Sequence, residues 1–201
     1  MFFKKTVLKR MLKSAYTGAG LIVGHMESED EGEGYYVSSG WWTIWFNTET
    51  FPKEAKAAII ELCGELPGTD VVFKAIKDCG NQYEIEQKEV YDIRAAFVKS
   101  DFEYRVTNIV ETGRYGDLRI LQAEKTGKVQ AVSEVFLDLI DEDHIDEAGG
   151  EIPPLGPYAL SEQGSLLYWG TNHCYLMAHT VTPRDEKEEA FWKTLESTEI
   201  I

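Results

Sequence analysis

The chain of 201 residues lacks any apolar run near the roughly 20 residues that a membrane-spanning helix needs. It has only three cysteines, Cys63, Cys79 and Cys174, and none lies in a CxxC pair. The odd number and the spacing indicate unpaired, reduced thiols, as in a cytoplasmic protein. The opening "MFFKKTVLKRMLK" contains no apolar segment of signal-peptide length, so we expect no secretory leader. These absences predict a cytoplasmic protein that does not enter the membrane.

Sequence fingerprints of enzymes are missing as well. There is no GxSxG, HExxH, P-loop or dinucleotide-binding motif. The glycines of "TGAGLIVG" follow a predicted helix and lead into a predicted strand, which is the reverse of a phosphate-binding turn. His173 and Cys174 are neighbours in a predicted strand, so their side chains point to opposite faces and cannot act as a pair. We therefore predict no catalytic residue, no metal site and no cofactor, and we expect a protein that is not an enzyme.

Positive charge is scarce and unevenly placed. The chain has 20 Lys and Arg against 35 Asp and Glu, a formal net charge of −15. Such a balance disfavours general binding to nucleic acid or to an anionic membrane unless the basic residues are segregated. They are segregated at the N-terminus, where five cations occur before the first acid, Glu27.

Two predicted helices carry the basic residues. Apolar residues recur every four positions from Phe3 to Ala15, which predicts a helix over residues 3–16 with the cations in a second stripe. Another helix is predicted over residues 53–66, after Pro52. A charged stripe is commonly just a solvated helix face. The alternative is a patch that neutralises phosphates of duplex DNA without reading bases, in a strongly salt-dependent way. The DNA-binding candidates are Lys4, Lys5, Lys9, Arg10, Lys13, Lys53 and Lys56.

The stretch "WWTIWF" at residues 41–46 is a predicted strand that is apolar on both faces. Trp41 and Trp45 point one way, and Trp42, Ile44 and Phe46 point the other. The second face needs a cover, which could be the acidic loop "ESEDEGEG", the C-terminal helix with Trp192, or another protein. The partner-binding candidates are Trp41, Trp45 and Trp192.

The order of predicted elements repeats weakly along the chain. Strands are predicted at residues 21–26, 35–46, 71–77, 83–93, 95–100, 104–112 and 118–124, with three short strands in 158–181 and further helices at 134–140 and 184–197. In both halves a helix is followed by a turn and a pair of strands. This order predicts an α+β fold, and the short turns favour antiparallel pairing.

The order resembles a domain of the sliding clamps, the processivity factors of DNA polymerases. "FFKKTVLKRMLKSAY" is similar to the basic first helix of that family, "FPKEAKAAIIELCGELPG" to its second helix and "DVVFKAIKDCGNQYEIE" to its closing hairpin. "GSLLYWGTNHCYLMAHTV" is similar to the last hairpin of a clamp. The resemblance implies two clamp-like units of antiparallel sheet with helices on one face, at residues 1–90 and 91–183, followed by a charged C-terminal helix or tail at 184–201.

The second half departs from the family pattern. "VYDIRAAFVKSDFEYRVTNI" reads as extended where a first helix is expected, and the clear helix at residues 134–140 is acidic. The resemblance implies a non-enzymatic, clamp-like DNA-tethering or processivity factor that forms a homo-oligomeric ring, with duplex DNA and a polymerase or other replication protein as partners. The alternative is an acidic protein–protein interaction module, an inhibitor or adaptor, that has a clamp-like fold and does not encircle DNA.

Overall fold

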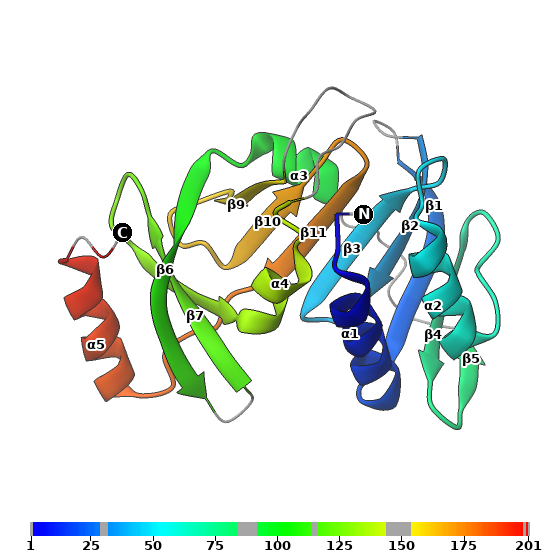
Figure 1. The fold of residues 1–201 in the computed structure, drawn as a ribbon, viewed down its shortest axis with the longest axis horizontal. Helices are drawn as coiled ribbons and strands as arrows, with labels where there is room; N and C mark the ends of the chain where they lie inside the picture. Colours follow the sequence, from blue (N-terminus) through cyan, green and yellow to red (C-terminus); the bar gives the residue numbers. More distant parts are fainter. Residues whose placement is uncertain are drawn as a thin grey trace.

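The computed structural model describes residues 2–28, 32–83, 92–113, 116–143, 154–198 and 200. These residues form an α+β fold, which is drawn in Figure 1. Its antiparallel sheet has 11 strands. The strands are β1 (Leu21–Ser28), β2 (Gly32–Ser38), β3 (Trp42–Asn47), β4 (Val71–Ile76), β5 (Gly80–Gln82), β6 (Phe102–Gly113), β7 (Gly116–Ala123), β8 (Val129–Ser133), β9 (Leu155–Ala159), β10 (Leu166–Gly170) and β11 (Cys174–His179). The helices are α1 (Lys5–Thr17), α2 (Lys53–Cys63), α3 (Ile93–Lys99), α4 (Glu134–Leu139) and α5 (Glu186–Glu196). The predicted α+β class and antiparallel pairing are confirmed.

Each half of the chain contributes one contiguous block of strands. The order across the sheet is β5-β4-β1-β2-β3 and then β11-β10-β9-β6-β7-β8. The blocks join where β3 pairs with β11, with Phe46 opposite Cys174. The five strands of the first block and the last five strands of the second have the same order relative to the chain. In each set the fifth and fourth strands come first, followed by the first, second and third: β5-β4-β1-β2-β3 and β10-β9-β6-β7-β8. The division near residue 90 into two similar clamp-like units stays a prediction.

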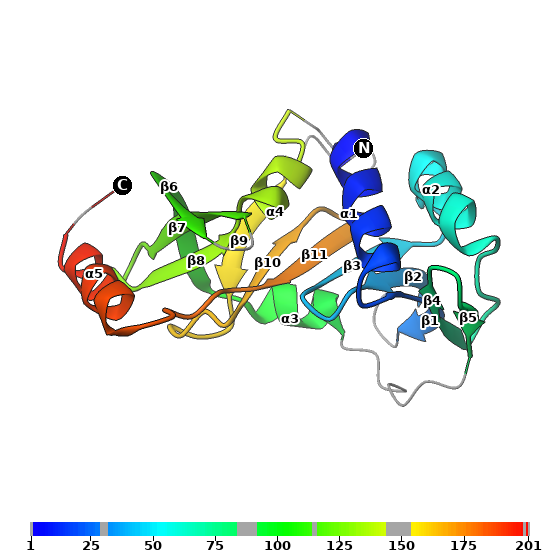
Figure 2. The ribbon, with the colours of Figure 1, turned by 90° about the horizontal axis from the view of Figure 1, so that it is seen from below.

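Helices cover both faces of the sheet. Figure 2 shows α4, α1 and α2 side by side on one face and α3 on the other. The main core lies beneath the first three and includes Leu121 and Val132. Their neighbours along the strands, Ile120 and Ala131, point the opposite way and pack with α5. The expectation that the helices lie on one face is therefore wrong for α3, because the strands of the sheet centre are apolar on both faces and need two covers.

Helix α3 replaces a predicted strand. Residues 95–100 were expected to be extended, but residues 93–99 are helical. The Asp92 side chain accepts a hydrogen bond from the backbone N–H of Ala95 at 2.9 Å and so caps the helix. Ile93 and Ala96, three positions apart, are buried on one side. The strand predicted at residues 83–93 lies largely outside the described residues.

Strand β3, which is apolar on both faces, is buried within the chain. Trp42, Ile44 and Phe46 belong to the core beneath α1 and α2. Trp45 lies on the reverse face with aromatic side chains of β2 and β11 and with α3. Its indole lies over Gly34, where an added Cβ would come within 2.3 Å of the ring. The cover of the second face is therefore α3 and the neighbouring aromatic rings, and α5 packs elsewhere.

Candidate nucleic-acid interface

Helix α1 occupies the middle of the three-helix layer. Its apolar stripe buries Leu8, Met11, Leu12 and Ala15 in the main core. The stretch before the helix is fixed as well, because the N–H of Lys4 donates to the carbonyl oxygen of Leu139 at 2.7 Å. Since the apolar stripe faces the sheet, the basic stripe of the same helix faces outward.

The predicted cations lie on this outer surface with one exception. Lys53 of α2 is exposed, whereas Lys56 is half-buried with its ammonium 5.2 Å from the ring centroid of Phe51. All five N-terminal cations are exposed: Lys4, Lys5, Lys9, Arg10 and Lys13. The structure therefore places six of the seven DNA-binding candidates where a phosphate could reach them.

The helical layer has a charge opposite in sign to that of the whole chain. Helices α1, α2 and α4, with Lys4, carry seven Lys or Arg and four Asp or Glu. One of those acids, Glu134, is bound to Arg119 of β7 and is three-quarters buried. The layer is thus a locally basic surface on a protein of net charge −15.

Two acids flank α1, one on each side. Lys9 Nζ lies 3.3 Å from Glu61 Oε2 of α2, and Arg10 Nη2 lies 3.9 Å from Asp138 Oδ2 of α4. All four side chains are between 44% and 70% exposed. Exposed pairs of this kind contribute about 0–1 kcal/mol, so they leave the cations available to a competing anion. Lys4, Lys5 and Lys13 form no ion pair with any residue that the structure describes.

The sequence did not signal these flanking acids. Glu61 is one of several acids in the predicted second helix, and Asp138 is one of the acids in the predicted acidic helix at residues 134–140. Their positions beside α1 depend on how the three helices pack on the sheet. Spacing along the chain carries no such information.

The three tryptophan candidates for partner binding differ in exposure. Trp41, at the turn before β3, is 68% exposed and makes an edge contact with the ring of His179 at 6.1 Å. Trp45 and Trp192 are only 8% and 6% exposed. In the folded chain α3 covers Trp45, and β7 and β8 cover Trp192, so of the three only Trp41 is largely exposed; the partner-binding role of these residues stays a prediction.

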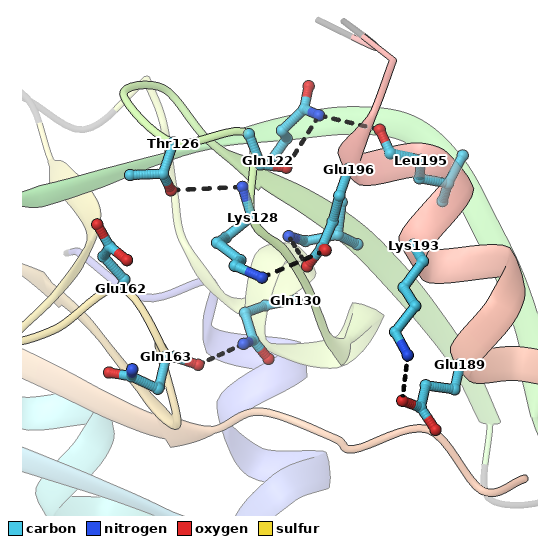
Figure 3. A network of polar contacts seen from close by, with 12 residues as sticks. Gln122, Thr126, Lys128, Gln130, Glu162, Gln163, Glu189, Lys193, Leu195 and Glu196 are labelled. Carbon is cyan, nitrogen blue, oxygen red and sulfur yellow. Dashed lines mark hydrogen bonds and ion pairs between the residues drawn. The ribbon is translucent and has the colours of Figure 1, made fainter. Parts of the chain in front are cut away.

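Trp192 of α5 packs against Ile120, Val129 and Ala131 of β7 and β8. Polar contacts, several of them drawn in Figure 3, also hold the helix there. The Gln122 side chain donates to the carbonyl oxygen of Leu195 at 3.2 Å, at the end of the helix. The Lys128 ammonium lies 3.3 Å from Glu196 Oε2. The Arg184 guanidinium lies 2.8 Å from Glu111 Oε1 and joins the start of α5 to β6. The C-terminal helix is thus a docked part of the fold.

Cysteines, histidines and acids are the side chains to consider for metal binding or nucleophilic chemistry. No group of three or more His, Cys, Asp and Glu among them could hold a metal ion. Burial raises the pKa of the Cys63 thiol to about 11 and raises that of Cys174 further, so neither is a ready nucleophile. His25 Nε2 lies 3.0 Å from Glu33 Oε1, but the imidazole is 6% exposed and cannot reach a substrate. The three cysteines are unpaired, as predicted.

Two further observations bear on the class of protein. In the described part of the chain, none of the helices is long and apolar enough to cross a membrane. In comparisons with known proteins, the chain matches no family model, no curated protein and no solved structure.

Proposed function

We propose that this protein is a non-enzymatic, clamp-like DNA-tethering or processivity factor that binds duplex DNA through α1 and acts as a ring-forming oligomer. The observation that carries the proposal is the outward stripe of five cations at the centre of the helical layer. The similarity to sliding clamps in the order of elements supports the same reading. Cytoplasmic location and a polymerase or other replication protein as partner belong to this proposal.

The proposed DNA contact is with the phosphate backbone. Lys5, Lys9 and Lys13 recur at four-residue steps along α1, so they form one row on the helix surface. A row of ammonium groups neutralises phosphates without distinguishing bases. Each neutralised phosphate contributes about −0.9 to the slope of log K against log salt, so three contacts give a slope near −3 per subunit.

The two ends of the sheet are where neighbouring copies in a ring would meet. Strand β5 at one end has three residues. Strand β8 at the other end already forms a bridge between Ala131 and Val181. Contacts between copies would therefore include side chains of the adjoining helices as well as strand edges. Native mass spectrometry tests this part, since a ring requires a multiple of 22.8 kDa and a monomer at all concentrations would argue against it.

The DNA contact is tested by fluorescence anisotropy with a short labelled duplex at rising salt. Wild type is expected to bind at low salt with a slope no steeper than about −3, and the triple variant K5E/K9E/K13E is expected not to bind. The three side chains are exposed, and exchange of an exposed charge changes the free energy of unfolding by no more than about 0.5 kcal/mol. Loss of binding would therefore mean that these three lysines contact DNA, and would not be explained by unfolding.

A matched control separates the α1 stripe from net charge. The variant K99E/K125E/K187E carries the same change of charge at three exposed lysines of other surfaces. It should retain most of the affinity. Equal loss of binding in both variants would mean that the affinity for DNA depends on the total charge of the protein, and the assignment of the DNA contact to α1 would be withdrawn.

An interaction module is the second candidate function, and one observation favours it. Trp41 is 68% exposed, and large aromatic residues at protein interfaces commonly provide much of the binding energy. On this reading the flanking acids cancel the basic stripe, so wild type binds no DNA even at low salt. The anisotropy titration on wild type distinguishes the two functions directly.

A further inference from the structure

The two acids that flank α1 each lie beside one of its cations. Glu61 Oε2 is 3.3 Å from the ammonium of Lys9, and Asp138 Oδ2 is 3.9 Å from the guanidinium of Arg10. Carboxylate and phosphate oxygens accept the same charge-assisted hydrogen bonds from these groups. A phosphate that approaches α1 at these positions must therefore displace a carboxylate of the same chain.

We propose that Glu61 and Asp138 are affinity-setting residues that compete with the DNA backbone for the cations of α1. The inference rests on the proposed DNA-binding function and deepens it. Because an acid stands on each side of the helix, Lys9 and Arg10 can exchange between a carboxylate and a phosphate. Such exchange keeps each contact weak and short-lived, and a tether that moves along a duplex needs contacts of that kind.

A purely structural role for these pairs does not fit the packing. Helix α1 is already held by Leu8 and Leu12, which are 2% and 1% exposed in the main core. Its N-terminal end is fixed to α4 by the backbone hydrogen bond from Lys4 to Leu139. The carboxylates of Glu61 and Asp138 are 70% and 57% exposed, so they add little to this attachment.

The competition predicts a particular dependence of the DNA affinity on salt concentration. When a paired cation moves from its carboxylate to a phosphate, the DNA releases a condensed counterion, but the freed carboxylate attracts a cation from solution, so the net release is smaller. The wild-type slope of log K against log salt is therefore shallower than the number of phosphate contacts implies. Neutral replacements at both acids should steepen it by up to about 0.9 for each cation that they release.

The test compares wild type with the isosteric variant E61Q/D138N in the anisotropy titration. Each neutralised acid should tighten binding about two- to fivefold, the range given by the energies of exposed ion pairs. The control variant D117N/E162Q makes the same change of net charge at exposed acids outside the helical layer. Thermal melting should show that both variants are folded like wild type.

A double-mutant comparison then tests whether the gain in affinity arises from the Lys9–Glu61 ion pair. In a Lys9→Gln background, Glu61→Gln should give little further gain, because the cation that it releases is gone. Equal gains in E61Q/D138N and D117N/E162Q, or a full gain from Glu61→Gln without Lys9, would overturn the inference. If wild type and all variants fail to bind, the proposed DNA-binding function fails. If wild type binds with a slope near −3 and E61Q/D138N binds no tighter, only the competition is wrong.

Discussion

The attachment of α5 can be tested at Gln122, which is 3% exposed on β7 (Figure 3). Its Nε2 donates to the carbonyl oxygens of Thr198 at 2.8 Å and of Leu195 and Gly127 at 3.2 Å. Its Oε1 accepts from the N–H of Ile200 at 3.1 Å. One amide thus binds the end of α5, the following tail and the turn before β8.

We expect Gln122→Ala to weaken the docking of α5 by about 2–3 kcal/mol. A net hydrogen bond contributes about 1 kcal/mol, and the two N–H groups and one carbonyl of the amide supply two to three such bonds. The loss corresponds to an increase of about 30- to 160-fold in the opening equilibrium of the helix. Because α5 rests on one edge of the fold, it can open without the rest unfolding.

Hydrogen exchange measured by mass spectrometry locates the effect. Amides of residues 186–196 should lose protection in the variant, whereas amides of the central strand β11 should not change. Gln130→Ala is the matched control, because Gln130 lies on β8 and donates to the carbonyl oxygen of Gln163, away from α5. If both variants leave α5 equally protected, the assigned role of the Gln122 amide is wrong.

Three further outcomes are expected from the structure. Trp45→Ala should lower the free energy of unfolding by about 3–5 kcal/mol in urea, and Trp41→Ala by no more than about 0.5 kcal/mol, because only Trp45 is buried. Glu134→Gln should cost about 1–2 kcal/mol near neutral pH and almost nothing in acid. The hydrogen bond from Arg119 lowers the pKa of the Glu134 carboxyl. The stabilisation from this pair is therefore fully present above the ordinary glutamate pKa and is lost as pH falls through the lowered pKa. Urea titrations at several pH values would measure this loss. A thiol reagent should find three free thiols in denatured, unreduced protein, and in native protein exposed Cys79 should react far faster than buried Cys174.

The elements that could be predicted from the sequence are those whose pattern is local. The N-terminal helix follows from apolar residues at four-residue steps, and the structure places α1 at Lys5–Thr17. Helix α3 is seven residues long, which is too short for a clear helical period, and its apolar stretch predicts a strand. Its one local signal was Asp92, a residue type that caps helices, three positions before Ala95.

The candidate site could be predicted only in part, for a similar reason. The cations of α1 are neighbours in sequence, so their common surface follows from helical spacing. The partners of Lys9 and Arg10 come from residues 61 and 138, which only tertiary packing brings to α1. The burial of Trp192 is likewise tertiary, because Ile120, Val129 and Gln122 belong to distant strands.

The pairing of β3 with β11 has a consequence for the order in which the protein can fold during synthesis. Phe46 on β3 emerges from the ribosome long before its partner Cys174 on β11. At about 5–20 residues per second, the interval of 128 residues lasts roughly 6–26 s. Throughout that time one edge of the tryptophan-rich strand has no neighbour, and an open apolar edge invites pairing with other chains. Because this pairing spans most of the chain, the edge of β3 is completed only after the last hairpin has been synthesised.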